Sequence, residues 1–384
     1  MNNFFKLQFK SKKSKARCGI LNTAHGCLAT PFFMTIATRG VVKSVTTADL
    51  QRLKIPIILA NTYHLFLRPS LKILKRAGGL HQFMNWSGPI LTDSGGFQIF
   101  SLDGEVKRKG ISQQEIKVDR LLTDQGVEFV SYLDGSKHFF SPADVIRAQK
   151  IIGSDLMMVL DKCVAYPASY EVAKKAVDRT LLWAEKSIKS YQAQKIVRQK
   201  LFGIVQGSTF SDLRLLCARE LAKMNFAGLA IGGLAVGEKN EQMYQILDEL
   251  QDVLPVDKPR YLMGVGYPDN IVAAVKRGVD MFDCVIPTRE ARHARLYIRL
   301  NQRVSKINNY YQTINLNNAA WALDKKPINS KSVIPELCQY SLSYLHHLFK
   351  INDPLALRLA TLHNIEFYYN LMNDIRVSIK KGDL

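Results

Sequence analysis

Three aspartates that follow short apolar runs are the residues best suited to chemistry in this sequence. The runs at 89–91, 156–160 and 281–282 lead to Asp93, Asp161 and Asp283. If the runs are parallel strands of one barrel, their carboxyl ends meet and the three side chains share a pocket. Carboxylates crowded without counter-charge cannot all stay ionised, so at least one should have a raised pKa. Such a set supplies a nucleophile and a general acid/base, the pair that breaks a glycosidic bond with retention.

Further polar groups follow runs of the same kind. Asn61, Gln206 and Gly233 come after the runs at 56–60, 201–205 and 229–231. A single aspartate at a strand end is more often a turn or helix-cap residue, and we assign Asp134 of the Asp-Gly-Ser turn to that class. The hypothesis therefore depends on the convergence of the set. The histidines at 25, 64, 346 and 347 show no ligand-like spacing, and we expect them to be packing or surface residues.

Eight apolar runs of strand length alternate with helix-length stretches along most of the chain. The runs lie at 56–60, 89–91, 127–133, 156–160, 201–205, 229–231, 261–263 and 281–282, and helices are predicted at 142–152, 171–191 and 268–277. Nearly continuous hydrophobicity is typical of strands buried on both faces. The alternation predicts an α/β fold, an irregular (β/α)₈ TIM-type barrel rather than an open doubly wound sheet. No G-x-G-x-x-G follows a strand, which disfavours a dinucleotide fold.

Four parts are predicted along the chain. Residues 1–35 alternate as antiparallel strands and form an N-terminal β cap, and residues 36–289 form the barrel core with the active site. Residues 290–352, rich in arginine and asparagine, are a basic subdomain inserted after the eighth strand. Residues 353–384 form a C-terminal helix that closes the barrel.

The charge balance points to the partner. The 384 residues contain 53 Lys and Arg against 33 Asp and Glu, a formal net charge of +20, and 47% hydrophobic residues exclude a largely disordered chain. This excess favours a polyanion, nucleic acid before a membrane surface, with solubility as the alternative explanation. No apolar run reaches the roughly 18 residues of a membrane span and no signal peptide is evident, so we expect a cytoplasmic protein. Six scattered cysteines are typical of reduced thiols.

The segments around these polar groups resemble the tRNA-guanine transglycosylases of bacterial type, also called queuine tRNA-ribosyltransferases. The matching segments, in family order, are 61–65, 92–98, 153–161, 203–207, 231–238 and 261–292. The resemblance covers about residues 15–295, with a weaker match from 340 onward. It implies an irregular (β/α)₈ barrel that exchanges the wobble guanine of a tRNA anticodon for a 7-deazaguanine in queuosine biosynthesis, with no cofactor in the chemistry.

The resemblance also implies a role for each site residue. Asp283 would be the nucleophile that attacks ribose C1′, and Asp93 the general acid/base for the departing and incoming bases. The base would be held by Ser94, Gly95, Gly96, Phe97, Asp161, Gln206, Gly233 and Met263, with Phe97 and Met263 against its faces and Asn61 and Gln98 near the ribose. The tRNA would contact Gly264, Val265, Gly266, Tyr267, Pro268, Asp269, Thr288, Arg289 and Arg292. The implied partners are tRNA, a 7-deazaguanine base and a second copy of the chain in a homodimer, with no membrane.

Two positions near the site depart from the family pattern, and a third differs from the eukaryotic relatives. Lys162 stands where the family has glutamate, and Glu290 stands where it has asparagine between two arginines. Eukaryotic relatives tend to have glycine at Val236, where it makes room for the cyclopentenediol of queuine. We therefore expect this chain to favour the smaller 7-aminomethyl-7-deazaguanine, because overfilling a packed pocket is costly.

The structural zinc of the family is expected to be lost. Relatives carry Cys-x-Cys-x-x-Cys in the insertion and a histidine further on, whereas this chain retains only Cys338 and His363 as vestigial candidates. Two ligands do not make a closed tetrahedral site. A Cys338–His363 pair completed by two outside ligands is the alternative.

Two other functions are considered. A catalytically silent tRNA-binding homologue, acting as a partner subunit, would have no need of both Asp93 and Asp283, so their retention argues against it. A glycoside hydrolase would share the barrel and the carboxylates. The basic excess and the three tryptophans argue against a sugar cleft.

Overall fold

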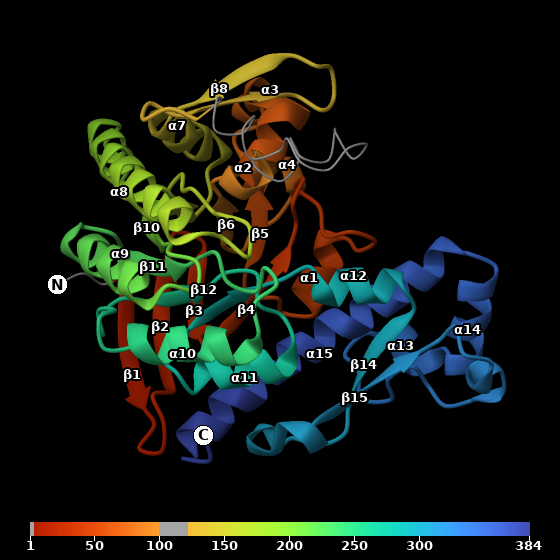
Figure 1. Cartoon of the computed structure of the whole chain (residues 1–384). Helices are drawn as coiled ribbons and strands as arrows, with labels where there is room; N and C mark the ends of the chain where they lie inside the picture. Colours follow the sequence, from red (N-terminus) through yellow and green to blue (C-terminus); the bar gives the residue numbers. More distant parts are fainter. Residues whose placement is uncertain (1–3, 100–121) are drawn as a thin grey trace.

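The computed structural model describes residues 4–99 and 122–384, so the predicted barrel core of 36–289 is described except for 100–121. Eight parallel strands close into a barrel, with helices around it (Figure 1). In ring order the strands are β10 (Lys200–Val205), β11 (Gly228–Ile231), β12 (Arg260–Leu262), β13 (Met281–Asp283), β4 (Phe32–Ile36), β5 (Ile58–Asn61), β6 (Ile90–Asp93) and β9 (Leu156–Met158). The predicted TIM-type α/β fold is confirmed.

One predicted barrel strand is wrong. The run at 127–133 forms β7 (Val127–Val130), which pairs antiparallel with β8 (Lys137–Phe140) in a hairpin outside the barrel. Buried and more exposed residues alternate along β7, as expected for a strand with one covered face. Asp134 lies in the turn of this hairpin, where its Oδ1 accepts from the Ser136 amide at 3.2 Å, as predicted.

The missing barrel strand comes from the predicted cap. β4 spans Phe32–Ile36 and pairs with β13 on one side and β5 on the other. Its first four residues are all buried, since both faces of this strand are covered. The cap therefore ends before β4 and consists of β1 (Phe5–Lys10), β2 (Arg17–Thr23) and β3 (Gly26–Thr30). The predicted boundary at residue 35 lies one strand too late.

The predicted helices begin where their caps require. Ser141 makes a capping box at the start of α7 (Pro142–Ile152), and the Ser169 side chain accepts from the Val172 amide at the start of α8 (Tyr170–Ala193). The other helical segments before and around the barrel are α1 (Thr47–Arg52), α2 (Thr62–Leu65), η1 (Phe66–Ser70), α3 (Leu71–Arg76), α4 (Leu80–Met84), α9 (Ser211–Lys223), α10 (Asn240–Leu250), α11 (Pro268–Val275) and α12 (Ile286–Arg292).

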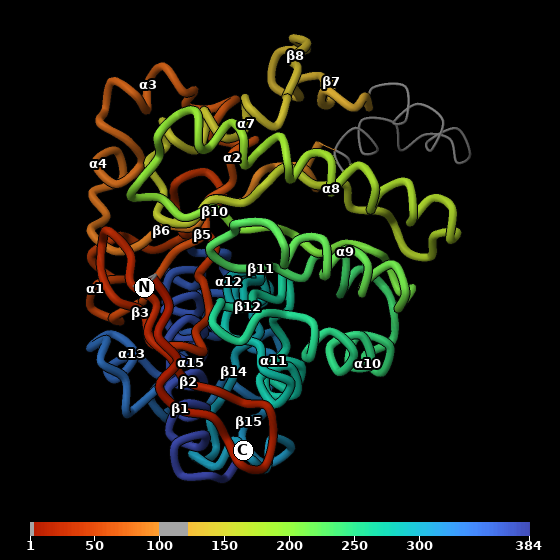
Figure 2. Tube along the Cα trace, turned by 90° about the vertical axis from the view of Figure 1, so that its left-hand side faces the viewer, coloured from red at the N-terminus to blue at the C-terminus, as the bar shows by residue number. Residues whose placement is uncertain are grey.

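The β cap covers the N-terminal end of the barrel. Arg17 on β2 donates to Asp280, which directly precedes β13, and to the carbonyls of Val256 and Lys258 ahead of β12. Figure 2 shows this sheet beside the C-terminal end of the last helix, where Arg376 donates to the Pro31 carbonyl. The cap thus lies at the opposite end of the strands from Asp283.

The inserted subdomain projects to one side of the barrel (Figure 1). It contains β14 (Arg295–Arg299), η2 (Val304–Asn309), β15 (Tyr311–Asn315), η3 (Ala319–Leu323), α13 (Pro335–Gln339) and α14 (Leu342–Lys350). The long helix α15 (Pro354–Lys380) joins both parts, since Tyr368 packs on Phe33 of the barrel while Asn364 donates to the Arg295 carbonyl. Within the described residues no helix is long and apolar enough to cross a membrane.

Candidate active site

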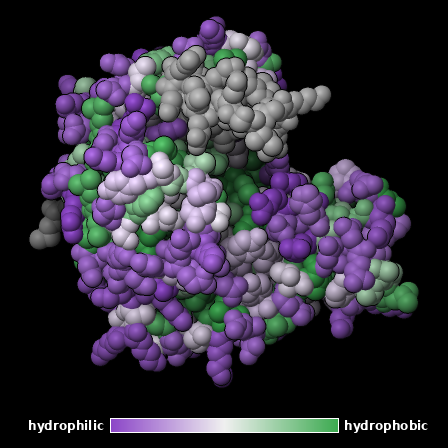
Figure 3. All heavy atoms as spheres, viewed as in Figure 1, coloured by the Kyte–Doolittle hydropathy of each residue, from purple (hydrophilic) through white to green (hydrophobic). Residues whose placement is uncertain are grey.

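A cavity of about 280 Å³ lies at the C-terminal ends of the barrel strands, as the barrel prediction requires. Ten of the predicted site residues line it: Asn61, Asp93, Phe97, Gln98, Asp161, Gln206, Gly233, Met263, Gly264 and Asp283. They come from segments more than 200 positions apart, so the convergence inferred from strand ends is confirmed. The surface in Figure 3 shows hydrophobic residues in a hollow near the centre of this view, with hydrophilic residues over most of the rest.

Asp93 is the last residue of β6 and is held by an amide. Asn61 Nδ2 donates to Asp93 Oδ2 at 3.0 Å and to Gln98 Oε1 at 2.9 Å. Asn61 is itself oriented as the N-cap of α2, where its Oδ1 accepts from the His64 amide. Burial, and then the nearby carboxylates of Asp161 and Asp283, raise the pKa of Asp93 to about 7. A group with this pKa can give or take a proton near neutral pH.

Asp283 is the last residue of β13, and it accepts two hydrogen bonds at its Oδ1 atom. The Tyr261 hydroxyl donates to Asp283 Oδ1 at 2.6 Å, and the Gly264 amide donates to the same atom at 2.8 Å. Within the described residues Oδ2 accepts no hydrogen bond from the protein. Burial raises the pKa of Asp283, and the two donors oppose that shift. A carboxylate oriented through one oxygen, with the other unengaged, has the arrangement of a nucleophile.

Asp161 and Gln206 form a polar edge on the cavity. Gln206 Nε2 donates to Asp161 Oδ2 at 2.7 Å, and burial raises the pKa of Asp161 to about 6. Gln206 Oε1 is buried and has no hydrogen-bond partner among the described residues. A Cβ at Gly233 would come within 2.4 Å of this oxygen, so only glycine fits there. Two acceptor groups side by side suit a flat heterocycle that presents N–H donors.

The remaining predicted base contacts divide into two groups. Phe97, half exposed, and Met263, partly buried, both line the cavity. Ser94 and Gly95 do not line it, and they shape the turn that carries Phe97. Ser94 Oγ accepts from the Gly96 amide, and a Cβ at Gly95 would lie 2.6 Å from Tyr63. Gly96 packs against Asp161, where a Cβ would be 3.0 Å from its carbonyl oxygen.

Comparison with known proteins decides the family. The family model described as queuine tRNA-ribosyltransferase matches residues 11–384. The chain belongs to this family. It is 46% identical over 380 residues to the queuine tRNA-ribosyltransferase of Thermoanaerobacter pseudethanolicus, covering 99% of this chain and 94% of that protein. It is 42% identical over 373 residues to that of Staphylococcus aureus, covering 97% and 91%. The protein is therefore a tRNA-ribosyltransferase, a pentosyltransferase that modifies tRNA.

The arginines expected to hold tRNA in a queuine tRNA-ribosyltransferase follow the site directly. Arg289 and Arg292 lie on α12, which begins three residues after Asp283, and Arg292 Nη1 donates to the Thr288 carbonyl. Glu290, the departure noted in the sequence, lies 3.4 Å from Arg289 and 3.2 Å from Arg295. It therefore neutralises part of the charge that α12 presents.

The segment 264–269 is less exposed than its predicted role implies. Gly264 lines the cavity and Tyr267 is half exposed, but Val265 and Pro268 are buried. The carbonyl of Gly266 accepts from Tyr368 on α15, and Asp269 accepts from Tyr311 of the inserted subdomain at 2.6 Å. These contacts position the segment against its neighbours.

Sequence reasoning missed several residues at the site. Tyr261 sits inside a barrel strand and had no signal beyond its apolar neighbours. Arg39 and Lys43 line a second cavity that shares Ile36, Thr38 and Val285 with the first and also contains Arg292. Arg39 and Lys43 follow the barrel strand β4, and this position could have indicated them. Most of β4 falls in the predicted N-terminal cap instead. The shared wall places these cations beside the queuine tRNA-ribosyltransferase site.

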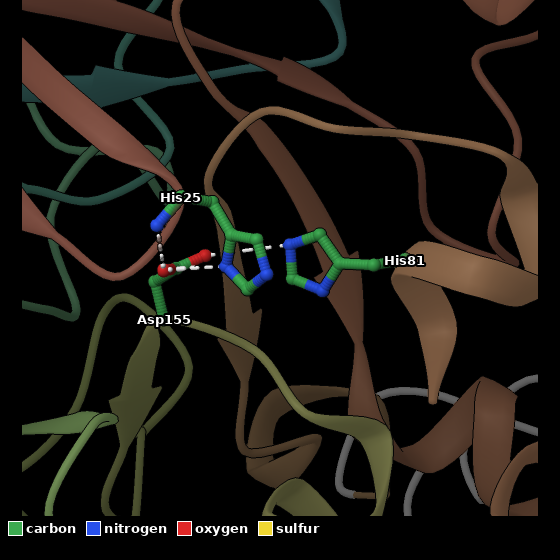
Figure 4. Close-up of side chains that lie close together, drawn as sticks. All are labelled: His25, His81 and Asp155. Carbon is green, nitrogen blue, oxygen red and sulfur yellow. Dashed lines mark hydrogen bonds and ion pairs between the residues drawn. The ribbon is translucent and has the colours of Figure 1, made fainter. Parts of the chain in front are cut away.

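His25 packs against His81 and Asp155, which agrees with the packing or surface role expected for it. Its ring stacks on His81 with centroids 3.6 Å apart and planes 18° apart, and both rings approach Asp155 (Figure 4). His25 Nδ1 lies 2.9 Å from Asp155 Oδ1, and His81 Nε2 lies 3.5 Å from Oδ2. An ion bound by both rings must lie near both ring planes, which nearly parallel planes do not allow. The group is therefore a hydrogen-bonded link from the cap to α4 and β9.

The zinc ligands of the queuine tRNA-ribosyltransferase family are represented by one thiol and one imidazole. Cys338 Sγ contacts the carbonyls of Asn329 and Ser332 at 3.3 and 3.4 Å. His363 Nε2 lies 2.9 Å from the Tyr297 carbonyl, and burial lowers the pKa of this histidine to about 4. Its Nδ1 is buried without a partner among the described residues. This donor set does not fit a closed tetrahedral site, which needs four ligands.

Proposed function

We propose that the protein exchanges the wobble guanine of a tRNA anticodon for 7-aminomethyl-7-deazaguanine, in queuosine biosynthesis, through a covalent enzyme–tRNA intermediate. The observation that carries this proposal is the pair of partly buried carboxyl groups with different surroundings in one cavity. Asp283 is oriented through Oδ1, whereas Asp93 has a pKa raised to about 7. One is suited to nucleophilic attack and the other to proton transfer.

In the first half-reaction Asp283 Oδ2 attacks C1′ and the bond from C1′ to N9 of guanine breaks. The electron pair goes to the departing guanine, which is protonated by Asp93, and the ribose is held as an ester of Asp283. In the second half-reaction Asp93, now ionised, takes the N9 proton of the incoming base. That nitrogen attacks C1′ and the Asp283 carboxylate leaves. Each proton and bond is restored at the end of the cycle.

The other site residues bind and shield the base. The polar edge of Asp161 and Gln206 accepts hydrogen bonds from the purine, and Phe97 and Met263 cover its faces. The base has to leave the anticodon stack to reach them, and a base bound in the cavity keeps water from the intermediate. Gln98 and Asn61 lie beside Asp93, where the ribose is expected.

The tRNA, rather than a free nucleoside, is the substrate that fits the surroundings. Arg39, Lys43 and Arg292 line the adjoining cavity, and the chain carries a net charge of +20. Phosphate contacts of this kind supply most of the affinity of a protein for RNA without specifying sequence. The proposal includes a homodimer and no structural zinc.

Exchange of labelled guanine into total tRNA tests the proposal. Wild-type protein should incorporate the label, and a denaturing gel should show a protein–tRNA adduct when competing base is present. A silent tRNA-binding homologue would bind tRNA but give neither label nor adduct. A glycoside hydrolase would release reducing sugar from oligosaccharides and leave tRNA unlabelled.

A further inference from the structure

We infer that Arg214 is a positioning residue that aims two backbone amides of the base site, an inference that rests on the proposed function. Arg214 lies on α9 and is fully buried, although it does not line the cavity. Its guanidinium donates only to carbonyl oxygens. Nε donates to Ser208 at 2.7 Å, Nη1 to Val205 at 3.0 Å and Gly232 at 2.6 Å, and Nη2 to Gly233 at 3.0 Å.

The positive charge of the Arg214 guanidinium interacts with backbone carbonyl groups. In the described part of the chain no carboxylate lies within ion-pair distance of Arg214. Burial lowers the pKa of Arg214 to about 10, so the group stays protonated at neutral pH. A buried cation is costly unless its donors are satisfied, and here four carbonyl dipoles satisfy it. This arrangement orders the segments after β10 and β11 together.

The geometry of the peptide group determines where the N–H groups that follow these carbonyls point. In a trans peptide the carbonyl oxygen and the following N–H point to opposite sides. Because the Gly232 and Gly233 carbonyls point at Arg214, the amides of Gly233 and Leu234 point away from it. Both residues line the cavity, and neither amide donates to a protein acceptor among the described residues. Arg214 therefore presents two N–H donors to a bound base.

The same guanidinium also fixes Gln206. The carbonyls of Val205 and Ser208 flank this residue, so both ends of its short segment are held while its side chain bonds Asp161. Lysine could not replace this function, because an ammonium lacks the planar fork that reaches four carbonyls at the ends of β10 and β11. The positive charge behind the peptides also polarises their N–H groups, which strengthens hydrogen bonds to an acceptor. The expected ligand group is the exocyclic oxygen of a 6-oxopurine.

Arg260 supplies a matched control. It is also buried and donates to backbone carbonyls, those of Gln251 and Leu254, but it begins β12 at the opposite end of the barrel from the cavity. Arg214→Lys and Arg260→Lys should both lower the melting temperature. Only Arg214→Lys should weaken guanine binding, by about tenfold, the factor for one net hydrogen bond.

The decisive readout is base discrimination, which a general loss of stability does not change. Wild-type protein should bind guanine more tightly than 2-aminopurine, which lacks both the 6-oxo group and the N1–H, and Arg214→Lys should lose the part of this preference that the 6-oxo group supplies. Folded Arg214→Lys with affinity and preference within about twofold of wild type would overturn the inference, as would an equal loss in Arg260→Lys.

A measurement on wild type covers the case in which Arg214→Lys does not fold. In ¹⁵N-glycine-labelled protein, the amide signal of Gly233 should shift on addition of guanine and shift less with 2-aminopurine. Equal shifts, or none with bound guanine, contradict the inference. Failure of wild type to bind guanine or to exchange it into tRNA would instead overturn the proposed function, and the inference with it.

Discussion

The partly buried carboxyl groups of Asp93 and Asp283 differ because different hydrogen-bond donors surround them. Asp93 receives one amide N–H from Asn61, whereas Asp283 receives a phenol and a backbone amide on a single oxygen. Burial raises the pKa of both, and these donors set how much of the shift remains. The two roles therefore follow from the groups around each aspartate, the Ser94 backbone and Asn61 at Asp93, and the Gly264 amide and Tyr261 at Asp283.

Removing each carboxyl group should have a different consequence. Asp283→Ala should abolish base exchange and the covalent adduct, since it removes the oxygen that we propose to attack C1′. Asp93→Ala should reduce exchange by roughly 10²–10⁴-fold, the usual contribution of a general acid/base, and still bind tRNA. Labelled-guanine exchange and a denaturing gel measure both. Exchange by Asp283→Ala near the wild-type rate is incompatible with the mechanism.

The raised pKa of Asp93 also predicts a dependence of stability on pH. The folded protein binds a proton at Asp93 up to about pH 7, whereas an unfolded chain releases it near pH 4. The stabilisation is complete below pH 4 and is lost as pH rises through 7. Asp93→Asn should therefore gain about 2 kcal/mol relative to wild type between pH 5 and 8.

Urea unfolding of both proteins at the two pH values measures this difference. Asp134→Asn, in an exposed turn remote from the cavity, is the control and should show no such gain. A constant difference between Asp93→Asn and wild type across this range contradicts the raised pKa.

The sequence indicated the three aspartates because their position after apolar runs is a local pattern. It did not indicate Tyr261 or Arg214, because each acts on a residue or carbonyl that lies elsewhere in the chain. Tyr261 is 22 positions from the carboxylate it contacts, and Arg214 is 19 positions from the Gly233 carbonyl. A role that depends on a tertiary contact cannot be recognised from the spacing of residues in the sequence.

Among the elements, the loop after β11 is the one that we propose to select the incoming base. Ala235 has a positive φ of 56°, and the Glu238 side chain accepts from the amides of both Ala235 and Val236. This clamp holds the Val236 side chain as part of the cavity wall. A bulky substituent on the base would have to displace it.

Val236→Gly should widen the accepted range of bases. We expect its relative use of queuine over 7-aminomethyl-7-deazaguanine to rise by about tenfold or more, because overfilling a packed pocket costs about 1–3 kcal/mol. Val236→Ala should give an intermediate effect. Competition assays with both bases measure the ratio, and a wild-type protein that already uses queuine equally well would contradict the expectation.

The strand error has a physical origin at the same scale. An apolar run of strand length identifies a strand but does not identify its partners. β7 has one covered face and pairs with β8 in a local hairpin. β4 directly follows the antiparallel strands of the cap in the sequence, and its apolar run looks like one more strand of that cap. Pairing depends on long-range packing, which explains why eight strands were expected and one of them was misplaced.

At the scale of the whole molecule, α15 joins the barrel to the inserted subdomain. This helix packs on the barrel through Tyr368 and on the insertion through Asn364, and the Glu366 carboxylate accepts from Asn329 and Val333 near Cys338. Burial of this long helix between the two parts can supply the stabilisation that zinc gives relatives.

Purified, tag-free protein should therefore contain well below one zinc per chain. Chelation should leave the melting temperature unchanged, and the insertion should unfold together with the barrel. Elemental analysis and calorimetric unfolding with and without chelator measure this, with a relative that retains the three cysteines as the positive control. About one zinc per chain, with unfolding on chelation, contradicts the expectation.

Because burial raises the pKa of Asp161, we expect binding of a base at the polar edge of the cavity to release a proton to the solvent. Below pH 6 the Asp161 carboxyl is largely protonated, and N–H donors from a bound purine favour its ionised form, in which both oxygens accept. At pH 5.5 guanine binding should expel about one proton into the buffer. The calorimetric heat should then vary with the ionisation enthalpy of the buffer, and this variation should fade at pH 8. Identical heats in all buffers at pH 5.5 would mean that Asp161 keeps its proton when the base binds, which would contradict this expectation.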